Sequence, residues 1–285
     1  PVRGMALQKA IDKLRGEKGT SIDLMVLRDG QETPIEFTIV RDTIQLSAVR
    51  SHVLEPGYGY VRISQFQTSS GDDFKKELRD LQQQENPLKG VIIDLRNNPG
   101  GLVPASVDIS DAILDGGTVV YTEGRLPSSN SRFEASKGDL LKGIPIVVLI
   151  NGGSASASEI VAGALQDHRR AAILGTQSFG KGSVQTVIPL GDGRAIKLTT
   201  ARYFTPNGRS IQAEGILPDI IVEPAEIRRY SLRDRVREAD LEGHLEQSDR
   251  DNESSVEPSE SVTDDNQLYE ALNILKGFQL LGRTP

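Results

Sequence analysis

The sequence lacks cysteine and tryptophan among its 285 residues, and its three histidines, His52, His168 and His244, are widely separated. Without cysteine the chain can form no disulfide, no thiolate zinc site and no cysteine nucleophile. A chain of this length buries enough core to be stable without a disulfide or a structural metal, so we expect no metal. The sequence also lacks an apolar run approaching the roughly 18 residues of a transmembrane helix, so no membrane span is expected.

Acidic charge is concentrated in one stretch of the chain. Between Asp240 and Asp265, ten acidic residues stand against one basic residue, Arg250, so this stretch carries −9 of a total net charge of −7. The remainder, at +2, has no concentrated basic stripe of the kind with which proteins bind nucleic acid. We therefore expect no nucleic-acid partner.

The first 43 residues predict a helix followed by a hairpin. One helical face there is apolar and consists of Leu7, Ala10, Ile11 and Leu14. Gly16 follows as a helix stop. Residues 21–27 and 35–40 are rich in apolar and β-branched residues, and the turn between them contains Asp29-Gly30. This segment is too small to bury much surface alone, so we interpret it as part of a small domain.

From about residue 44 to 225, short buried strands are predicted to alternate with helices. The expected strands are 59–63, 91–95, 118–121, 146–150, 172–174, 183–190 and 195–200, and the expected helices are about 71–83, 102–114 and 156–166. This alternation predicts an α/β layer architecture.

The last segment, residues 226–285, combines an acidic linker with a helix. Residues 231–266 are charged, rich in serine and poor in aromatics, which predicts a solvated, partly disordered linker. Apolar spacing returns at residues 268–281, which predicts a helix that docks on the body or on a partner chain.

A turn of small residues follows the apolar strand 146–150 and precedes a predicted helix. It reads Asn-Gly-Gly-Ser-Ala-Ser-Ala-Ser-Glu-Ile over residues 151–160. Small residues permit a sharp turn and the close approach of another chain. A serine in the first turn of that helix would lie beside free amide hydrogens, where an oxyanion is stabilised. The pattern is equally typical of a serine that only caps the helix.

A second glycine-rich run, residues 175–183, resembles a phosphate-binding P-loop. That motif needs Ser or Thr directly after its lysine, and a helix after that. Here Gly182 follows Lys181, and residues 183–188 are strand-like, so nucleotide binding is not expected. A solvated lysine in a glycine-rich loop is the plain alternative.

A third run, Asp94-Leu95-Arg96-Asn97-Asn98-Pro99-Gly100-Gly101, ends the buried strand 91–95. Its glycines can expose backbone amides toward a ligand at the carboxyl edge of a sheet. An ordinary Pro-Gly turn would give the same pattern.

No histidine is placed to act as a base for the serine-rich run. His168 lies twelve residues after Ser156, which is about 18 Å along a continuous helix. His52 and His244 lie outside the expected sheet core. A serine without a histidine needs another base, and a lysine whose pKa is lowered by burial is the alternative with established chemistry.

Taken together, the three runs resemble those of the carboxyl-terminal processing, or tail-specific, serine peptidases. They agree in order and residue type, and the resemblance covers about residues 1–224. It implies that Ser156 is the nucleophile and that Lys181, 25 residues later, is the general base. It also implies that Gln185 holds the lysine amine in position.

The resemblance further implies an oxyanion hole made by the amide of Ala157 and by that of Gly100 or Gly101, with the choice between the glycines left open. Ser154 and Ser158 would support the turn, and Glu159 would cap or brace the helix. No cofactor is implied, because the reaction is acyl transfer between protein groups and water.

The implied fold is α/β: a ClpP/crotonase-like spiral of βαβ units with a cap at residues 44–225, a partial PDZ domain at 1–43 and a C-terminal helical tail at 226–285. The carboxylate-binding loop of such a PDZ domain would lie upstream of Pro1.

Family members are generally exported to the periplasm, the cell envelope or the thylakoid lumen. Their substrates are protein tails with unstructured C-terminal ends. Homo-oligomers and adaptor proteins recur, which makes the helix 268–281 a candidate contact. The alternative function is a catalytically silent, peptide-binding scaffold with a peptidase fold.

Overall fold

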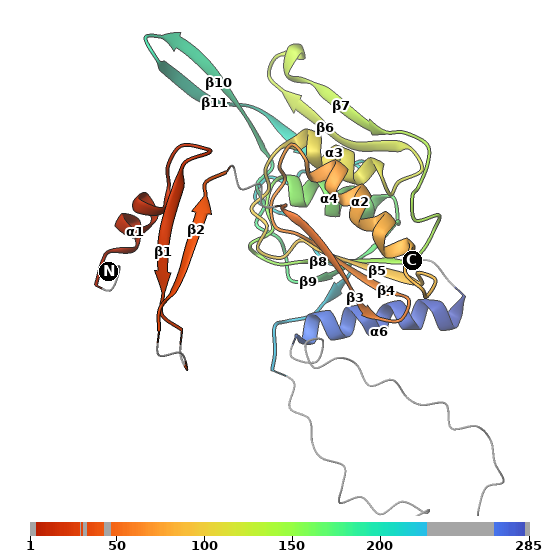
Figure 1. The fold of residues 1–285 in the computed structure, drawn as a ribbon. Coiled ribbons are helices and arrows are strands. Elements are labelled where there is room, and N and C mark those ends of the chain that lie inside the picture. The colour runs from red at the N-terminus through yellow and green to blue at the C-terminus, as the bar shows by residue number, and fades with distance from the viewer. Residues whose placement is uncertain (1–3, 29, 31–32, 43–46, 227–264, 283–285) are drawn as a thin grey trace, which may run out of the picture. The chain divides into compact units, whose positions relative to one another are not determined.

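The computed structural model describes residues 4–28, 30, 33–42, 47–226 and 265–282. Most of the predicted acidic linker, and His244 within it, lie outside the described residues. The chain divides into two compact units, Pro1–Leu46 and Ser47–Pro285. Each unit is drawn in Figure 1 and is described by itself.

The first unit is a short helix with a two-stranded hairpin. Helix α1 (Leu7–Leu14) precedes strands β1 (Ser21–Val26) and β2 (Ile35–Val40), which pair antiparallel. No residue of α1 is buried. Arg41 joins the helix to the hairpin, because its Nε donates to the Leu14 carbonyl at 2.8 Å and its Nη1 donates to Thr20 Oγ1 at 2.9 Å. None of the described residues of this unit is buried, and they are held together by the strand pairing, Arg41 and an ion pair between Lys18 and Asp42.

The second unit is built on a six-stranded sheet. Its strands lie in the order β12 (Ile220–Ile221), β9 (Ala172–Gly175), β8 (Ile146–Ile150), β5 (Gly90–Asp94), β4 (Tyr58–Ile63) and β3 (Val49–Glu55). All neighbouring pairs are parallel except β3 with β4. Every residue of the central strands β5 and β8 is buried, as their continuous apolar runs predict for a parallel sheet. The turns that follow β5 and β8 therefore emerge side by side at one edge.

Helices cover both faces of this sheet (Figure 1). On one face lie α2 (Ser70–Gln82), α3 (Val103–Asp111) and α4 (Ala157–Asp167), and on the other lies α6 (Asn266–Leu281). Alternate strand residues serve the two cores: Val91, Ile93, Val148 and Ile150 pack with the first group of helices, whereas Ile92, Val147 and Leu149 pack with α6. The sheet is thus the middle layer of three.

A second sheet forms a cap. It contains β10 (Ser183–Gly191), β11 (Arg194–Phe204), β6 (Gly117–Gly124) and β7 (Ser131–Ala135) in that order, all antiparallel, with a 3₁₀ turn, η1 (Pro127–Ser129), between β6 and β7. Strands β10 and β11 continue as a ribbon that projects from the body of this unit (Figure 1). Lys181 lies two residues before this ribbon begins.

The α/β class predicted from the alternating pattern is confirmed, whereas three strands were missed: β3, β7 and the two-residue β12. Strand β3 carries Arg50, Ser51 and His52 at the sheet edge, and β7 reads Ser-Arg-Phe-Glu-Ala, so neither shows a clear apolar pattern. His52 was expected outside the sheet core, before its first strand. It is exposed, but it lies on the missed edge strand β3, where it pairs with Tyr60 of β4.

Helix α6 adopts one of the two docking alternatives that its sequence left open. Its apolar face is already buried on the chain's own sheet (Leu268, Ala271, Leu272 and Leu275). That face is therefore not available to a partner chain. No helix in the part of the chain that the structure describes combines the length and hydrophobicity needed to span a bilayer.

Candidate active site

Ser156 lies at the sharp turn between strand β8 and helix α4, where it is the N-cap residue. Its backbone has φ 58° and ψ −109°. A non-glycine residue with positive φ is uncommon and costs free energy, so the surrounding structure must hold it in place. A strained serine between a strand and a helix is also the backbone arrangement that exposes a nucleophile above a sheet.

The turn is fixed from within by its other serines, as expected for supporting residues. Ser154 Oγ donates to the Leu95 carbonyl at 2.8 Å and accepts from the Asn151 amide at 3.0 Å. Ser158 Oγ donates to the Asn98 carbonyl at 2.9 Å. Ser154 and Ser158 are both fully buried.

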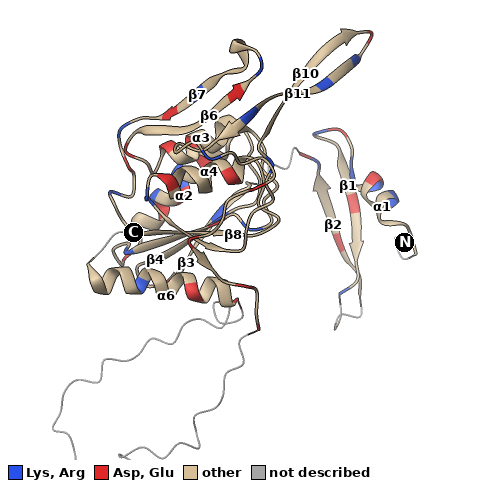
Figure 2. Ribbon diagram, turned by 180° about the vertical axis from the view of Figure 1, so that it is seen from behind, with Lys and Arg blue, Asp and Glu red and all other residues tan. Residues whose placement is uncertain are grey.

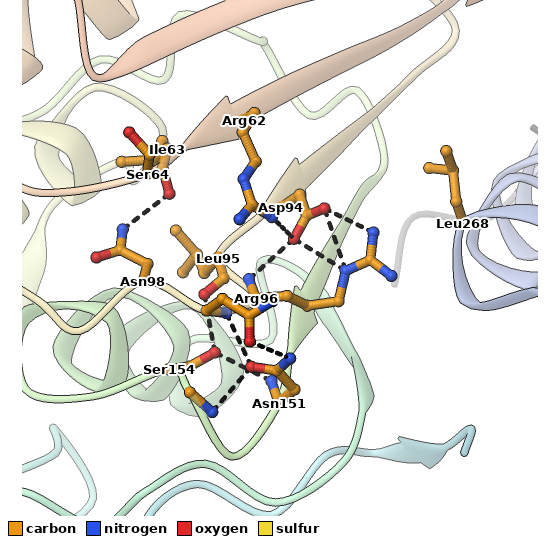
Figure 3. A network of polar contacts seen from close by, with 12 residues as sticks. Arg62, Ile63, Ser64, Asp94, Leu95, Arg96, Asn98, Asn151, Ser154 and Leu268 are labelled. Atoms are coloured by element: carbon orange, nitrogen blue, oxygen red, sulfur yellow. Dashed lines mark hydrogen bonds and ion pairs between the residues drawn. The ribbon is translucent and has the colours of Figure 1, made fainter. Parts of the chain in front are cut away.

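The segment Asp94–Gly101, which we call the glycine loop, lies against this turn. The Ala155 amide donates to the Asn98 carbonyl at 3.0 Å. The Asn97 amide donates to Asn151 Oδ1 at 2.8 Å, and Asn151 Nδ2 donates back to Asn97 Oδ1 at 3.0 Å. Asn98 itself is buried, and its Nδ2 donates to the Ile63 carbonyl at 2.8 Å (Figure 3). The glycine loop and the serine turn therefore form one hydrogen-bonded assembly.

Gly100 brings the backbone of the glycine loop close to the serine. A Cβ atom added at Gly100 would lie 2.9 Å from Ser156 Cβ and 3.1 Å from the Ala157 nitrogen. The φ of Gly100 is 102°, so glycine is required there both for conformation and for space. Its own amide is occupied, because it donates to Asn98 Oδ1 at 2.9 Å.

Gly101 and Ala157 differ from Gly100 in the state of their amides. Gly101 is exposed, and no hydrogen bond of the described residues uses its amide, whereas the next amide, that of Leu102, donates to the Phe66 carbonyl. Ala157 is the first residue of α4, so its amide has no acceptor within the helix. Among the described hydrogen bonds, neither of these two amides has an acceptor, and of the two residues Gly101 is exposed whereas Ala157 is buried.

The buried carboxylate of Glu159 joins the serine to the lysine loop. Glu159 Oε2 accepts from the Ser156 amide at 2.7 Å and from the Lys181 amide at 2.9 Å. Glu159 Oε1 accepts from Ser178 Oγ and from the Gly180 amide, both at 2.6 Å. The family resemblance implied that Glu159 caps or braces the helix, and these bonds agree with a capping role at Ser-x-x-Glu spacing. Its contact with the loop of Gly180 and Lys181 had no local signal.

The predicted base and its orienting residue lie at the foot of the ribbon. Lys181 follows Gly180, and Gln185 lies on β10; both are exposed. Among the hydrogen bonds of the described residues, none joins Lys181 Nζ to Ser156 Oγ, and none uses the Gln185 side chain. The structure thus brings the backbones of Ser156 and Lys181 to one carboxylate without joining their side chains.

The two described histidines have other neighbours. His168 ends α4, and its Nε2 lies 2.7 Å from the Thr118 carbonyl. The His52 ring packs on the Tyr60 ring, with 4.8 Å between their centroids. Neither is hydrogen-bonded to Ser156, in accord with the geometric expectation for His168.

Charge around the site is dispersed. Figure 2 shows lysine and arginine residues scattered over the elements of the described chain instead of gathered along one of them. No group of three or more histidine, aspartate or glutamate side chains within the described ranges could hold a metal ion.

Comparisons with known proteins agree on one family. A profile described as Peptidase family S41 matches residues 57–222. The chain is 48% identical over 282 residues to a carboxy-terminal-processing protease of Bartonella bacilliformis, with 97% of this chain and 65% of that protein covered. It is 43% identical over 223 residues to a carboxyl-terminal-processing protease of Synechocystis sp., with 77% of this chain and 51% of that protein covered.

A solved structure is also similar. The photosystem II D1 C-terminal processing protease matches with a TM-score of 0.57 and 32% sequence identity, over 78% of this chain and 60% of that chain. The chain therefore spans less than two thirds of the length of each of these three relatives.

Proposed function

The chain belongs to peptidase family S41, and from this membership we propose that it is a serine endopeptidase that cleaves protein substrates at or near their C-terminal tails. The names of the relatives in Bartonella and Synechocystis support this substrate class. The observation that carries the proposal is local: Ser156, in a strained helix-start conformation, shares the Glu159 carboxylate with the backbone of Lys181.

In the proposed mechanism Ser156 is the nucleophile and Lys181 is the general base. The neutral Lys181 amine takes the proton of Ser156 Oγ as the oxygen attacks the peptide carbonyl carbon. The tetrahedral intermediate collapses when the protonated lysine passes that proton to the leaving amine. Water, deprotonated by the same lysine, then releases the acyl-enzyme as a carboxylic acid and restores the serine. Gln185 is proposed to orient the lysine amine during these steps.

The oxyanion is proposed to bind between the amides of Ala157 and Gly101. Ala157 supplies the first amide of α4, at the positive end of the helix dipole. Gly101 is favoured over Gly100 as the second oxyanion donor, because the amide of Gly100 already donates a hydrogen bond to Asn98 Oδ1. This choice narrows the pair of glycines that the sequence left open.

Substrate binding is proposed to bring the Lys181 amine into a hydrogen bond with the Ser156 hydroxyl. Lys181 is exposed, and a protonated, hydrated ammonium would be a poor base. A peptide laid over the site excludes water from the amine, and loss of that water favours the neutral amine that a base requires. Catalytic hydrogen bonds are commonly loose before substrate binds, so the absence of a Ser156–Lys181 bond fits this sequence of events.

The test compares cleavage of an unfolded protein by the unaltered chain, by Ser156→Ala and Lys181→Ala, and by Lys197→Ala as a control on the exposed ribbon. Both site variants are expected to lose at least about a thousandfold in kcat, as removal of a nucleophile or its base does. Lys197→Ala should retain activity. Equal cleavage by all the variants would refute the assignment, and peptide binding without cleavage by the unaltered chain would favour the scaffold.

We extend the proposal to the rest of the molecule. Residues 1–43 are proposed to be the second half of a PDZ domain, for which a helix followed by an antiparallel hairpin gives support. The protein is proposed to be exported to the periplasm or cell envelope and to form homo-oligomers. An adaptor protein is a further proposed partner, which the family resemblance implies.

A further inference from the structure

A single guanidinium links the glycine loop to the C-terminal helix. Arg96 lies within the glycine loop, two residues before Asn98. Its Nη2 lies 2.7 Å from Asp94 Oδ2 and 2.7 Å from Asp265 Oδ2, and its Nη1 donates to Asp265 Oδ1 at 3.0 Å and to Gln267 Oε1 at 2.9 Å. Asp265 is the N-cap of α6, and Gln267 is in its first turn. Arg96 therefore bridges elements that are 169 residues apart in the sequence.

The Asp94 side of this bridge is rigid. Asp94 ends the buried strand β5, and its side chain is 1% exposed. It accepts from the Tyr60 hydroxyl at 2.8 Å. It also accepts from the Arg96 amide at 2.8 Å and pairs with Arg62 Nη1 at 2.8 Å (Figure 3). Burial, and next the charge of Asp94, raise the pKa of Tyr60, so its hydroxyl remains a donor. A buried carboxylate satisfied on all sides is a fixed anchor for the arginine.

The Asp265 side depends on the docking of α6. Asp265 caps the helix, since its Oδ1 accepts from the Leu268 amide at 3.1 Å. The helix itself is held on the sheet by buried side chains, of which Leu272 and Leu275 are 1% and 0% exposed. Only when α6 is docked does the second carboxylate reach the guanidinium.

The path continues from Arg96 to the reacting groups through the glycine loop. The residues that follow Arg96 are Asn97 and Asn98, which hold the serine turn through Asn151 and Ala155. The loop ends at the glycine whose amide we assign to the oxyanion hole. A shift of Arg96 would therefore move the oxyanion donor relative to Ser156.

We propose that Arg96 is a positioning residue, and that docking of α6 through Asp265 sets the glycine loop in its oxyanion-binding position. This inference rests on the proposed peptidase function and deepens it, because it makes the C-terminal helix an intrachain activator of the site. Among the described residues, no hydrogen bond or ion pair joins the helix to Ser156, Gly100 or Gly101, and its polar contacts with the glycine loop are those of Arg96.

A second ion pair on the same helix supplies a matched comparison. Lys276 Nζ pairs with Glu55 Oε2 at 2.7 Å, and Glu55 is 9% exposed. Glu55 ends strand β3 and has no contact with the glycine loop among the described hydrogen bonds and ion pairs. Loss of this pair weakens the docking of α6 without changing the groups around Arg96.

The experiment uses the full chain with Asp265→Asn and Lys276→Gln. Asparagine keeps a helix-capping oxygen but removes the charge and one oxygen acceptor from Arg96. Hydrogen exchange of peptides covering residues 96–102 and 151–157 is measured without substrate. Asp265→Asn is expected to speed exchange in both peptides severalfold, whereas Lys276→Gln is expected to change exchange only in α6 and its neighbours. Unchanged exchange of both peptides in Asp265→Asn would overturn the proposal.

Activity provides a second readout. If the chain cleaves an unfolded protein, Asp265→Asn is expected to lower kcat by about three- to tenfold with little change in KM, since a misplaced oxyanion donor affects the transition state alone. Arg96→Lys should lower kcat at least as much, because lysine cannot bridge both carboxylates. Equal kcat losses in Asp265→Asn and Lys276→Gln, in proportion to lost stability, would contradict a positioning role.

The two readouts also separate this inference from the proposed function. A chain that fails to cleave any substrate refutes the peptidase proposal, while the exchange experiment still decides whether Asp265 holds the glycine loop.

Discussion

The Glu159 carboxylate accepts four hydrogen bonds around Ser156 and Lys181, although the proposed reaction assigns it no step. At the residue scale we expect Glu159→Gln to lower kcat by roughly ten- to a hundredfold and to reduce stability, because an amide presents only one acceptor oxygen to the four donors. Steady-state cleavage and urea unfolding would measure both effects. The control is Glu214→Gln, which changes an exposed carboxylate in a neighbouring loop. Equal behaviour of the two variants would contradict the role of Glu159.

Gly100 gives a second prediction at this scale. Gly100→Ala should reduce kcat by an order of magnitude or more, because the added methyl would crowd Ser156 and the amide of Ala157. Gly138→Ala is the matched control, since Gly138 also has a positive φ, 126°, but has no atom within 4 Å of the added Cβ. Both variants strain the backbone, and Gly100→Ala alone should affect cleavage. Similar kcat values would show that crowding at Gly100 is unimportant.

Sequence reasoning reaches some of these residues and not others. Short motifs identified the runs that contain Gly100, Ser156 and Lys181, because strand-to-helix turns and glycine loops leave a local signal. The role of Asn98 left none, since its partners, the Ile63 carbonyl and the Ala155 amide, come from distant parts of the chain. Sequence alone also could not tell that the amide of Gly100 has an acceptor and that of Gly101 has none among the described residues, because this depends on tertiary contacts.

At the scale of elements, helix α6 should contribute measurably to stability. Leu272→Ala is expected to lower the free energy of unfolding by about 2–5 kcal/mol, since the side chain is 1% exposed and its loss leaves a cavity. Leu280→Ala, at a position 87% exposed on the same helix, should change it by less than about 0.5 kcal/mol. Guanidinium unfolding compares them, and equal effects would mean that α6 is not docked in solution.

The cap of α6 predicts a pH dependence. Burial opposes ionisation of Asp265, but hydrogen bonds from Arg96 and from the Leu268 amide outweigh burial and hold the pKa of this carboxyl below its ordinary value. The ionised group therefore stabilises the folded state above its ordinary pKa, and this stabilisation is lost as pH falls toward the lowered pKa. The charged groups that face it are Arg96 directly and Asp94 through Arg96.

The measurement is the difference in stability between the unaltered chain and Asp265→Asn as a function of pH. We expect a constant difference near neutral pH that shrinks in acid, below about pH 4, where the ordinary carboxyl titrates. A difference that grows on acidification would mean that the carboxylate is not stabilised by Arg96.

Most elements of the second unit follow from its sequence because buried parallel strands are short, continuous apolar runs. Strands β5 and β8 are of this kind. The edge strand β3 and the cap strand β7 escape the same reasoning, since edge and cap positions tolerate polar side chains on both faces. The docking of α6 on the chain's own sheet, not on a partner, was one of two alternatives that periodicity could not separate.

At the scale of the whole molecule, the exposed apolar side chains of the ribbon bear on the proposed homo-oligomer. Ile188 pairs with Ile196, and Leu198 lies on the same face; they are 41%, 42% and 48% exposed. Joint replacement of Ile196 and Leu198 by lysine is expected to lower the mass measured by sedimentation, because apolar ribbon faces of this kind favour association.

Val187→Lys is the control, because Val187 lies opposite Lys197 on the other face of the ribbon. It should leave the sedimenting mass unchanged. A protein that is monomeric at all concentrations would refute the oligomer proposal, and an oligomer unaffected by the double replacement would place its interface elsewhere.

Hydrogen bonds join the start of α6 directly to residues 222–225 at the end of the peptidase core. The Ala225 amide donates to Asn266 Oδ1 at 2.9 Å, Asn266 Nδ2 donates to the Glu223 carbonyl at 2.8 Å, and Gln267 Nε2 donates to the Val222 carbonyl at 2.7 Å. Residues 222–225 and the start of α6 therefore lie next to each other, although they are about 40 residues apart in the sequence. The start of α6 is therefore held by residues 222–225 themselves, and a change in the length of the acidic sequence leaves these three hydrogen bonds in place.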